Sequence, residues 1–120
     1  MAPCTVFVVE DDHDTRDMLG RFLELEGFQV EVAANGRQAL DRLSAGVLPC
    51  VIVLDLMMPV MDGWQFRRQQ VLDSEIADIP VIVVSAAGKD RMAGIDANGY
   101  LAKPVDLEQL LEQVSQYCCE

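Results

Sequence analysis

The chain alternates short apolar runs with longer amphipathic segments from one end to the other. The apolar runs are rich in β-branched residues, which is typical of strands buried on both faces of a parallel sheet. Polar or turn-forming residues follow each run. We expect strands at Thr5–Val9, Phe28–Ala33, Val51–Leu54, Val81–Val84 and Gly99–Ala102.

The segments between these runs repeat their apolar residues at helical spacing. The expected helices cover Arg37–Ala45, Trp64–Leu72, a first segment with Met18, Leu19, Phe22 and Leu23, and a last one with Leu107, Leu110, Leu111 and Val114. The stretch Ala86–Asn98 departs from this pattern, because Gly88 and Gly94 interrupt it. We expect that stretch to be helical only in part.

Strands that alternate with helices form parallel βαβ units with right-handed crossovers. The pattern therefore predicts an α/β fold with helices on both faces of one sheet. The length of 120 residues suits a single domain over residues 1–120 and is too short for a second folded module. Neither an internal repeat nor a linker is evident in the sequence.

Charge and composition narrow the possible functions. Nine Lys and Arg against twenty Asp and Glu give a net charge of −11, which argues against binding nucleic acid or anionic membranes. No secretion signal or membrane-spanning apolar run is present, so we expect a cytoplasmic protein without membrane insertion. Paired metal-binding spacing is absent, and we expect reduced thiols at Cys4, Cys50, Cys118 and Cys119.

Chemically active side chains follow four of the five expected strands. In open parallel sheets, ligands bind beyond the carboxyl ends of the strands. Those ends carry, in chain order, the acidic cluster Glu10-Asp11-Asp12, then Asp55, Ser85 and Lys103. Carboxylates gathered at one edge repel each other, so the pattern favours a hard cation such as Mg²⁺.

These residue types together favour phosphoryl transfer. Asp55 ends a buried strand and can act as a nucleophile that forms an aspartyl phosphate. Mg²⁺ and Lys103 would neutralise the phosphoryl oxygens, and Ser85 could donate a hydrogen bond to one of them. Taken singly, each residue has a simpler role, such as helix capping by Asp12 or Asp14. Their joint occurrence at four strand ends favours the phosphoryl-transfer site.

The motifs around these residues resemble the receiver domain of two-component response regulators. The resemblance covers Val6 to about Tyr117, and it rests on Val8–Asp12, Leu54–Gly63, Val84–Ala86 and Tyr100–Pro104. The second motif is the most specific, because an aspartate at a strand end is followed by Met-Pro and then Asp-Gly. The family implies a flavodoxin-like, doubly wound (βα)5 three-layer sandwich. Its five parallel strands would lie in the order 2-1-3-4-5.

The resemblance also assigns roles at the phosphorylation site. It makes Asp55 the phosphoacceptor and Asp11 the direct Mg²⁺ ligand, with Glu10 acting mainly through water. Asp55 itself and the backbone carbonyl of Met57 would complete the protein ligands of the ion.

Three further residues match the switch of the family. Lys103 would contact the phosphoryl group, and its peptide bond to Pro104 is expected to be cis. Ser85 and Tyr100 match the switch pair, in which the hydroxyl moves toward the phosphoryl group and the aromatic ring turns inward. The interval from Ser85 to Lys103 is shorter than is usual in the family by about one helical turn, so we expect a short or irregular fourth helix.

The function that the resemblance implies is a receiver module of a phosphorelay. A sensor histidine kinase or a histidine phosphotransfer protein would donate the phosphoryl group, and an unidentified downstream protein would dock on the switched surface. No enzymatic activity is expected beyond self-phosphorylation and slow autodephosphorylation. A start at Met1 favours a complete protein, although a receiver fragment of a larger hybrid kinase or regulator would have the same sequence features.

Two other functions use similar residues. A small aspartyl-phosphate phosphatase or phosphotransferase shares the nucleophile and the metal, but such enzymes usually carry a second acid where this chain has Met57. A flavin binder of the same topology needs a phosphate-binding loop after the first strand, where Glu10-Asp11-Asp12 would repel phosphate.

Overall fold

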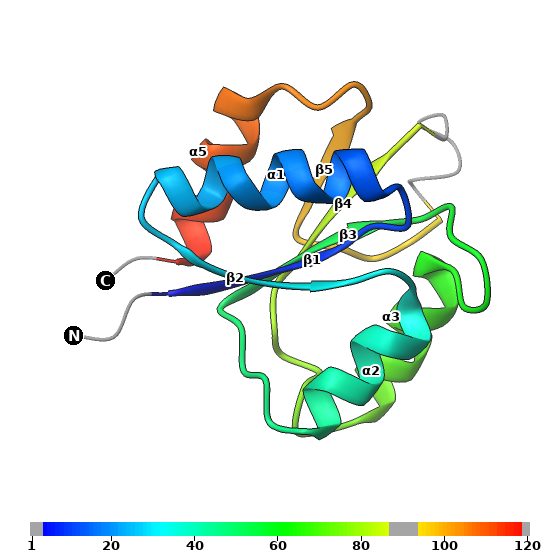
Figure 1. Cartoon of the computed structure of the whole chain (residues 1–120). Helices are drawn as coiled ribbons and strands as arrows, with labels where there is room; N and C mark the ends of the chain where they lie inside the picture. The colour runs from blue at the N-terminus through cyan, green and yellow to red at the C-terminus, as the bar shows by residue number, and fades with distance from the viewer. Residues whose placement is uncertain (1–3, 87–93, 119–120) are drawn as a thin grey trace.

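Strands and helices alternate along the chain in the computed structural model, which describes residues 4–86 and 94–118 (Figure 1). No helix within these ranges is both long enough and apolar enough to cross a membrane. The elements are β1 (Thr5–Val9), α1 (His13–Leu25), β2 (Gln29–Ala33), α2 (Gly36–Ser44), β3 (Val51–Asp55), α3 (Gly63–Leu72), β4 (Val81–Ser85), β5 (Gly99–Ala102) and α5 (Leu107–Tyr117).

The five strands form one parallel sheet in the order β2-β1-β3-β4-β5, which confirms the predicted order. β1 lies between β2 and β3, so Val6 faces Val30 on one side and Val51 on the other. The chain moves outward from β1 in both directions. The carboxyl ends of β1 and β3 therefore flank the point where the strand order reverses, which is where α/β sheets of this kind bind ligands.

The side chains of alternate residues in each inner strand pack on opposite faces of the sheet. In β1, Val6 packs in a core cluster that includes Leu110 of α5, whereas Phe7 packs in a second cluster that includes Phe66 of α3. Figure 1 shows α1 and α5 on one face of the sheet and α2 and α3 on the other. The prediction of a three-layer sandwich is confirmed, and burial on both faces explains why the strands are continuous apolar runs.

A short polar side chain caps the start of each described helix. The capping residues are Asp12 for α1, Asn35 for α2, Asp62 for α3 and Asp106 for α5. Asp12 accepts a hydrogen bond from the backbone N–H of Thr15 at 2.9 Å, so the cap of the first helix is Asp12 and not Asp14. Two hydrogen bonds from Thr15 lower the pKa of Asp12 below its usual value. The bond from the Thr15 hydroxyl has the larger effect, and the bond from its backbone N–H has the smaller.

The boundaries of several elements differ from the predictions by one residue. β2 begins at Gln29 and not at Phe28, and α3 begins at Gly63, directly after its cap. The prediction of a short or irregular fourth helix falls mainly on residues 87–93, which lie outside the described residues. Residues 94–98 form a turn and bends and no helix.

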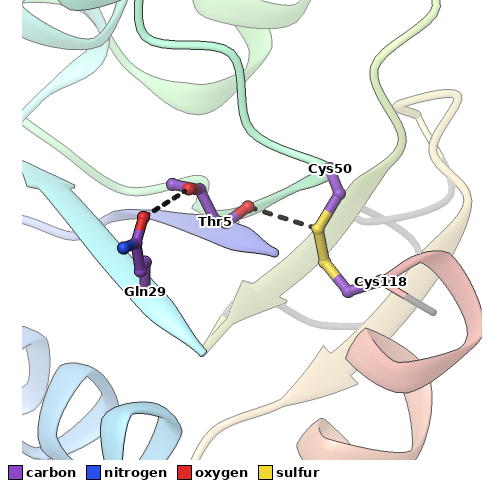
Figure 2. The surroundings of a disulfide bond; sticks show 4 residues. All are labelled: Thr5, Gln29, Cys50 and Cys118. Carbon is purple, nitrogen blue, oxygen red and sulfur yellow. Dashed lines mark hydrogen bonds between the residues drawn. A yellow bond between two sulfur atoms is a disulfide. The ribbon is translucent and has the colours of Figure 1, made fainter. Parts of the chain in front are cut away.

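The prediction of reduced thiols is wrong for Cys50 and Cys118. For Cys119 it lies outside the described residues. Cys50 and Cys118 form a disulfide (Figure 2). Cys4 is not part of this bond. The two bonded residues are 68 positions apart, so their linear spacing carries no signal. They meet because parallel strands begin at one edge of the sheet, and α5 runs back to that same edge.

Gly63 lets the start of α3 lie directly against the end of β3. Its backbone N–H donates to the carbonyl oxygen of Leu56 at 2.9 Å. A Cβ atom at this position would lie 2.6 Å from the backbone carbonyl oxygen of Asp55. The glycine is therefore required by close approach of two backbones beside Asp55.

We expect Gly63→Ala to lower the free energy of unfolding by at least about 2 kcal/mol, because the added methyl group collides with rigid backbone. Chemical denaturation measures the change. The matched control is Gly20→Ala inside α1, where a Cβ would meet Val30 at an ordinary 3.6 Å. That variant should gain up to about 1 kcal/mol from helix propensity. Equal effects of the two substitutions would contradict the close approach at Gly63.

Candidate functional site

Two acidic side chains and one lysine meet at the carboxyl edge of the sheet. Glu10 directly follows β1, Asp55 is the last residue of β3, and Lys103 directly follows β5. The carboxyl groups are buried, with 2% of Glu10 and 3% of Asp55 exposed. Lys103 Nζ lies 2.8 Å from Glu10 Oε1 and 3.4 Å from Asp55 Oδ2. The ammonium group thus bridges both carboxylates.

A third carboxylate belongs to the same cluster. Asp11 is exposed, and it contributes one oxygen atom to a group in which Glu10, Asp11 and Asp55 offer oxygens within 4.8 Å of one another. Carboxylate oxygens in this number are the ligands that hard divalent cations prefer. The donor set therefore fits Mg²⁺.

The environment of Asp55 disfavours its negative charge. Burial raises the pKa of this carboxyl group first, and the nearby charge of Glu10 raises it further. The charge of Lys103 and a backbone hydrogen bond from Met57 act in the opposite direction, and the net result is a pKa of about 7. Asp55 therefore holds a proton more readily than an ordinary aspartate does.

Lys103 is held in its charged form. Burial alone lowers the pKa of its ammonium group, but the hydrogen bond to Glu10 and the charges of Asp55 and Glu10 outweigh burial. The net pKa lies above the usual value for lysine. The peptide bond between Lys103 and Pro104 is cis, as predicted.

The backbone around Asp55 and Glu10 is also fixed by hydrogen bonds. The N–H of Met57 donates to Asp55 Oδ1 at 3.3 Å, while about half of the Met57 side chain is exposed. The N–H of Asp12 donates to Glu10 Oε2 at 3.1 Å. Both carboxylates are thus oriented by the loops that follow their strands.

Arg16 belongs to the site although the sequence reasoning did not select it. Its guanidinium group donates to the backbone carbonyl of Glu10 at 2.9 Å and to that of Asp11 at 3.4 Å. The signal that could have identified it is its place in the helix, four residues after the cap Asp12. A long side chain at that position can reach back over the end of β1.

Ser85 and Tyr100 lie on the neighbouring strands β4 and β5. Ser85 ends β4 and is fully buried, and its carbonyl oxygen accepts a hydrogen bond from the N–H of Lys103 at 3.0 Å. Tyr100 of β5 is partly exposed, and its hydroxyl donates to Ile95 O at 2.6 Å and accepts from Ala97 N at 3.1 Å. The ring is therefore tied to the segment that precedes β5.

Comparison with known proteins gives matches along almost the whole chain. The profile of the response regulator receiver domain matches residues 6–115. Response regulator MprA of Mycolicibacterium vanbaalenii is 43% identical over 116 residues, which cover 93% of this chain and 49% of that protein. The chain thus spans about half the length of the curated relatives that it matches.

Solved structures agree with the sequence matches. The chemotaxis response regulator CheY4 of Vibrio cholerae is 29% identical with a TM-score of 0.85, covering 97% of this chain and 99% of that chain. The receiver domain of a sensor histidine kinase from Pseudomonas aeruginosa is 25% identical with a TM-score of 0.87, covering 99% and 100%. That domain holds a magnesium ion in its active site cleft.

The raised pKa of Asp55 predicts how stability changes with pH in metal-free buffer. Below pH 3.8 the carboxyl group is protonated in both the folded and the unfolded state, so it does not oppose folding. As the pH rises from 3.8 through about 7, the unfolded state loses its proton more readily than the folded state, and the free energy of unfolding falls. We expect Asp55→Asn to melt about 5 °C higher than the wild type at pH 8. The two proteins should melt within about 1 °C of each other near pH 4.

Thermal melts followed by circular dichroism in the presence of a chelator test this expectation. Added Mg²⁺ should then raise the melting temperature of the wild type more than that of Asp55→Asn, because the variant lacks one carboxylate of the cluster. If Asp55→Asn melts below the wild type at pH 8 in metal-free buffer, the negative charge of Asp55 does not destabilise the fold.

Proposed function

The chain belongs to the family of response regulator receiver domains, and we propose on that basis that Asp55 accepts a phosphoryl group from a phosphohistidine. The donor would be a sensor histidine kinase or a histidine phosphotransfer protein. The observation that carries this proposal is the buried carboxylate of Asp55, bridged by Lys103 to Glu10 at the carboxyl edge of the sheet. A carboxylate in such a place is a rigid nucleophile beside a fixed positive charge.

The residues that would hold Mg²⁺ are Glu10, Asp11 and Asp55, together with the backbone carbonyl of Met57. When bound, the ion supplies positive charge to the phosphoryl oxygens and to the carboxylates around it. The clustering of the three carboxylates within 4.8 Å supports this assignment.

Asp55 would act as the nucleophile of the transfer. One of its carboxylate oxygens attacks phosphorus, the P–N bond to the donor histidine breaks, and the electron pair returns to the imidazole. Burial and the N–H of Met57 hold the carboxylate in one orientation, which reduces the entropy lost on reaction. Lys103 places its ammonium group beside the arriving phosphoryl oxygens, and the Ser85 hydroxyl donates a hydrogen bond to one of them.

Phosphorylation would change the surface around Tyr100. The new group adds nearly two negative charges and strong hydrogen-bond acceptors at Asp55. Ser85 and Lys103 move toward these acceptors, and the ring of Tyr100 turns inward and gives up its hydrogen bonds to Ile95 and Ala97. The segment before β5 is then free to take a second arrangement, which biases a two-state surface.

The output of the domain would be protein docking in the cytoplasm. A downstream protein would read the surface formed by β5, α5 and the segment before β5, and the net charge of −11 makes direct contact with nucleic acid unfavourable. Chemistry at the site would be limited to self-phosphorylation and slow autodephosphorylation, because water is the remaining acceptor for the phosphoryl group.

Phosphorylation can be tested without knowing the kinase. Phosphoramidate, which carries a P–N bond like phosphohistidine, serves as the donor in the presence of Mg²⁺. We expect mass spectrometry to detect one phosphoryl group on the wild type, and reductive trapping of the acyl phosphate should map it to Asp55. Asp55→Asn should lose the label, and removal of Mg²⁺ with a chelator should slow labelling at least tenfold.

Asp14→Asn is the matched control for that experiment. Asp14 is a fully exposed acid in the first turn of α1, outside the acidic cluster. This variant should be labelled at the rate of the wild type. Labelling that persists in Asp55→Asn at the same rate would refute the assignment of the phosphoacceptor.

We expect Tyr100→Phe to loosen the segment before β5 even without phosphorylation. The substitution removes the hydroxyl that bonds Ile95 O and Ala97 N, and each hydrogen bond contributes about 1 kcal/mol. Hydrogen–deuterium exchange of the Ala97 amide should therefore accelerate several-fold. Tyr117→Phe is the control, because its hydroxyl contacts Asn98 O of the same region at a longer 3.3 Å. Equal exchange at Ala97 in Tyr100→Phe and wild type would contradict the tether.

A further inference from the structure

Three cysteines converge at the edge of the sheet opposite the acidic cluster. Cys4 directly precedes β1, Cys50 directly precedes β3, and Cys118 directly follows α5. Their sulfur atoms all lie within 4.8 Å of one another. Cys50 and Cys118 form a disulfide, which Figure 2 shows. Their Cα atoms are 5.5 Å apart. Chain segments far apart in sequence thus bring three thiols to one place.

The three side chains differ in how far they reach solvent. Cys118 is buried with 6% exposed and belongs to the core cluster between the sheet and the helices α1 and α5. Cys4 and Cys50 are half-buried and pack against that same cluster. An incoming small molecule therefore reaches Cys50 more easily than Cys118.

Backbone hydrogen bonds of the sheet hold Cys4 and Cys50 in place. The N–H of Gln29 donates to Cys4 O at 2.9 Å, and the N–H of Cys50 donates to Thr5 O at 2.9 Å. The sulfur of Cys50 also lies 3.3 Å from Thr5 O, so a reduced Cys50 thiol can donate a hydrogen bond to that carbonyl. Both the bonded and the reduced form of Cys50 therefore have a partner in place.

Cys118 is attached differently from the other two cysteines. Its N–H donates to Val114 O at 2.9 Å, which continues the helical pattern of α5 beyond its last turn. The disulfide to Cys50 ties this helix end to the start of β3 across 68 residues of chain. Opening the bond would release the end of the helix while leaving the sheet intact.

We propose that Cys4, Cys50 and Cys118 form a thiol–disulfide exchange site that takes a low-molecular-weight disulfide, such as oxidised glutathione, as co-substrate. The Cys50 thiolate attacks one sulfur of the small disulfide, forms a mixed disulfide and expels one thiolate. The Cys118 thiolate then attacks Cys50 Sγ, forms the Cys50–Cys118 bond and expels the second thiolate. Two protein thiols are oxidised, one small disulfide is reduced to two thiols, and the thiol protons end on the products.

Cys4 adds a second oxidised form to this site. Its thiolate attacks Cys50 Sγ in the Cys50–Cys118 bond and expels the Cys118 thiolate, with no net oxidation. The sulfur atoms of Cys4 and Cys50 lie within 4.8 Å of each other, so a side-chain rotation can bring them to bonding distance. The exchange keeps the chain oxidised and frees the end of α5.

The experiment uses the full chain in a Cys119→Ser background, because Cys119 is adjacent to Cys118 and lies outside the described residues. Reduced protein is incubated with oxidised and reduced glutathione, quenched with acid, alkylated and weighed by mass spectrometry. Reduced protein should take up three alkyl groups, and oxidised protein should take up one and carry no glutathione. Peptide mapping should show the Cys50–Cys118 linkage.

Two variants separate the roles of the three thiols. Cys4→Ser should still form the Cys50–Cys118 bond. Cys118→Ser should form a Cys4–Cys50 bond in place of a lasting glutathione adduct. A stable adduct on Cys50 in Cys118→Ser would refute the role of Cys4, and a parent chain that stays reduced would refute the whole site. Zn²⁺ offers a second outcome. If Zn²⁺ protects all three thiols from alkylation and oxidised glutathione yields no disulfide, the proposal is overturned in favour of a thiolate metal site.

Reduction should also change the stability of the helix end. We expect the melting temperature to fall by about 10 °C when the Cys50–Cys118 disulfide is reduced, because this bond links residues 68 positions apart and restricts the unfolded chain. Amide exchange should accelerate at the last turn of α5, near Val114 and Cys118. Cys50→Ser should show no shift in either measurement on reduction, and unchanged exchange in the parent chain would overturn the link to α5. None of these measurements involves Asp55, so their failure leaves the proposed phosphorylation untouched.

Discussion

The repulsion between two buried carboxylates is the constraint on which the rest of the site depends. Glu10 directly follows β1, Asp55 ends the adjacent β3, and their oxygens lie within 4.8 Å of each other. At this separation two unit charges repel by about 3.5 kcal/mol at an effective dielectric constant near 20. That is a large part of the stability of a typical domain. Lys103 bridges the two groups and offsets much of the repulsion.

The same constraint supports the proposed switching at this site. Lys103 holds the acids together through one ammonium group, at 2.8 Å and 3.4 Å, while burial and the charge of Glu10 raise the pKa of Asp55 to about 7. Any cation or phosphoryl group that enters changes the partners of Lys103. Its backbone N–H donates a hydrogen bond to the carbonyl oxygen of Ser85 at the end of β4. A shift of Lys103 therefore moves the ends of the neighbouring strands β4 and β5.

The sequence allowed the sheet and the positions of the acids to be predicted, because both follow from local patterns. Buried strands are continuous apolar runs, and Asp55 stands directly at the end of one of them. Two features were not predicted, because they depend on contacts between residues that are apart in the sequence. Arg16 contributes through a long side chain that reaches back over Glu10. The Cys50–Cys118 bond depends on where α5 ends relative to β3, which no linear spacing encodes.

α5 connects the two edges of the sheet. It begins soon after Lys103, where Asp106 caps its first turn, and the residue that follows it, Cys118, is bonded to Cys50 at the start of β3. A helix whose far end is covalently tied can pivot about that end, but it cannot slide along the sheet. A helix released there can do both. If phosphorylation acts through Lys103 and β5 as proposed, the redox state of the cysteines determines which of these movements is open to the docking surface.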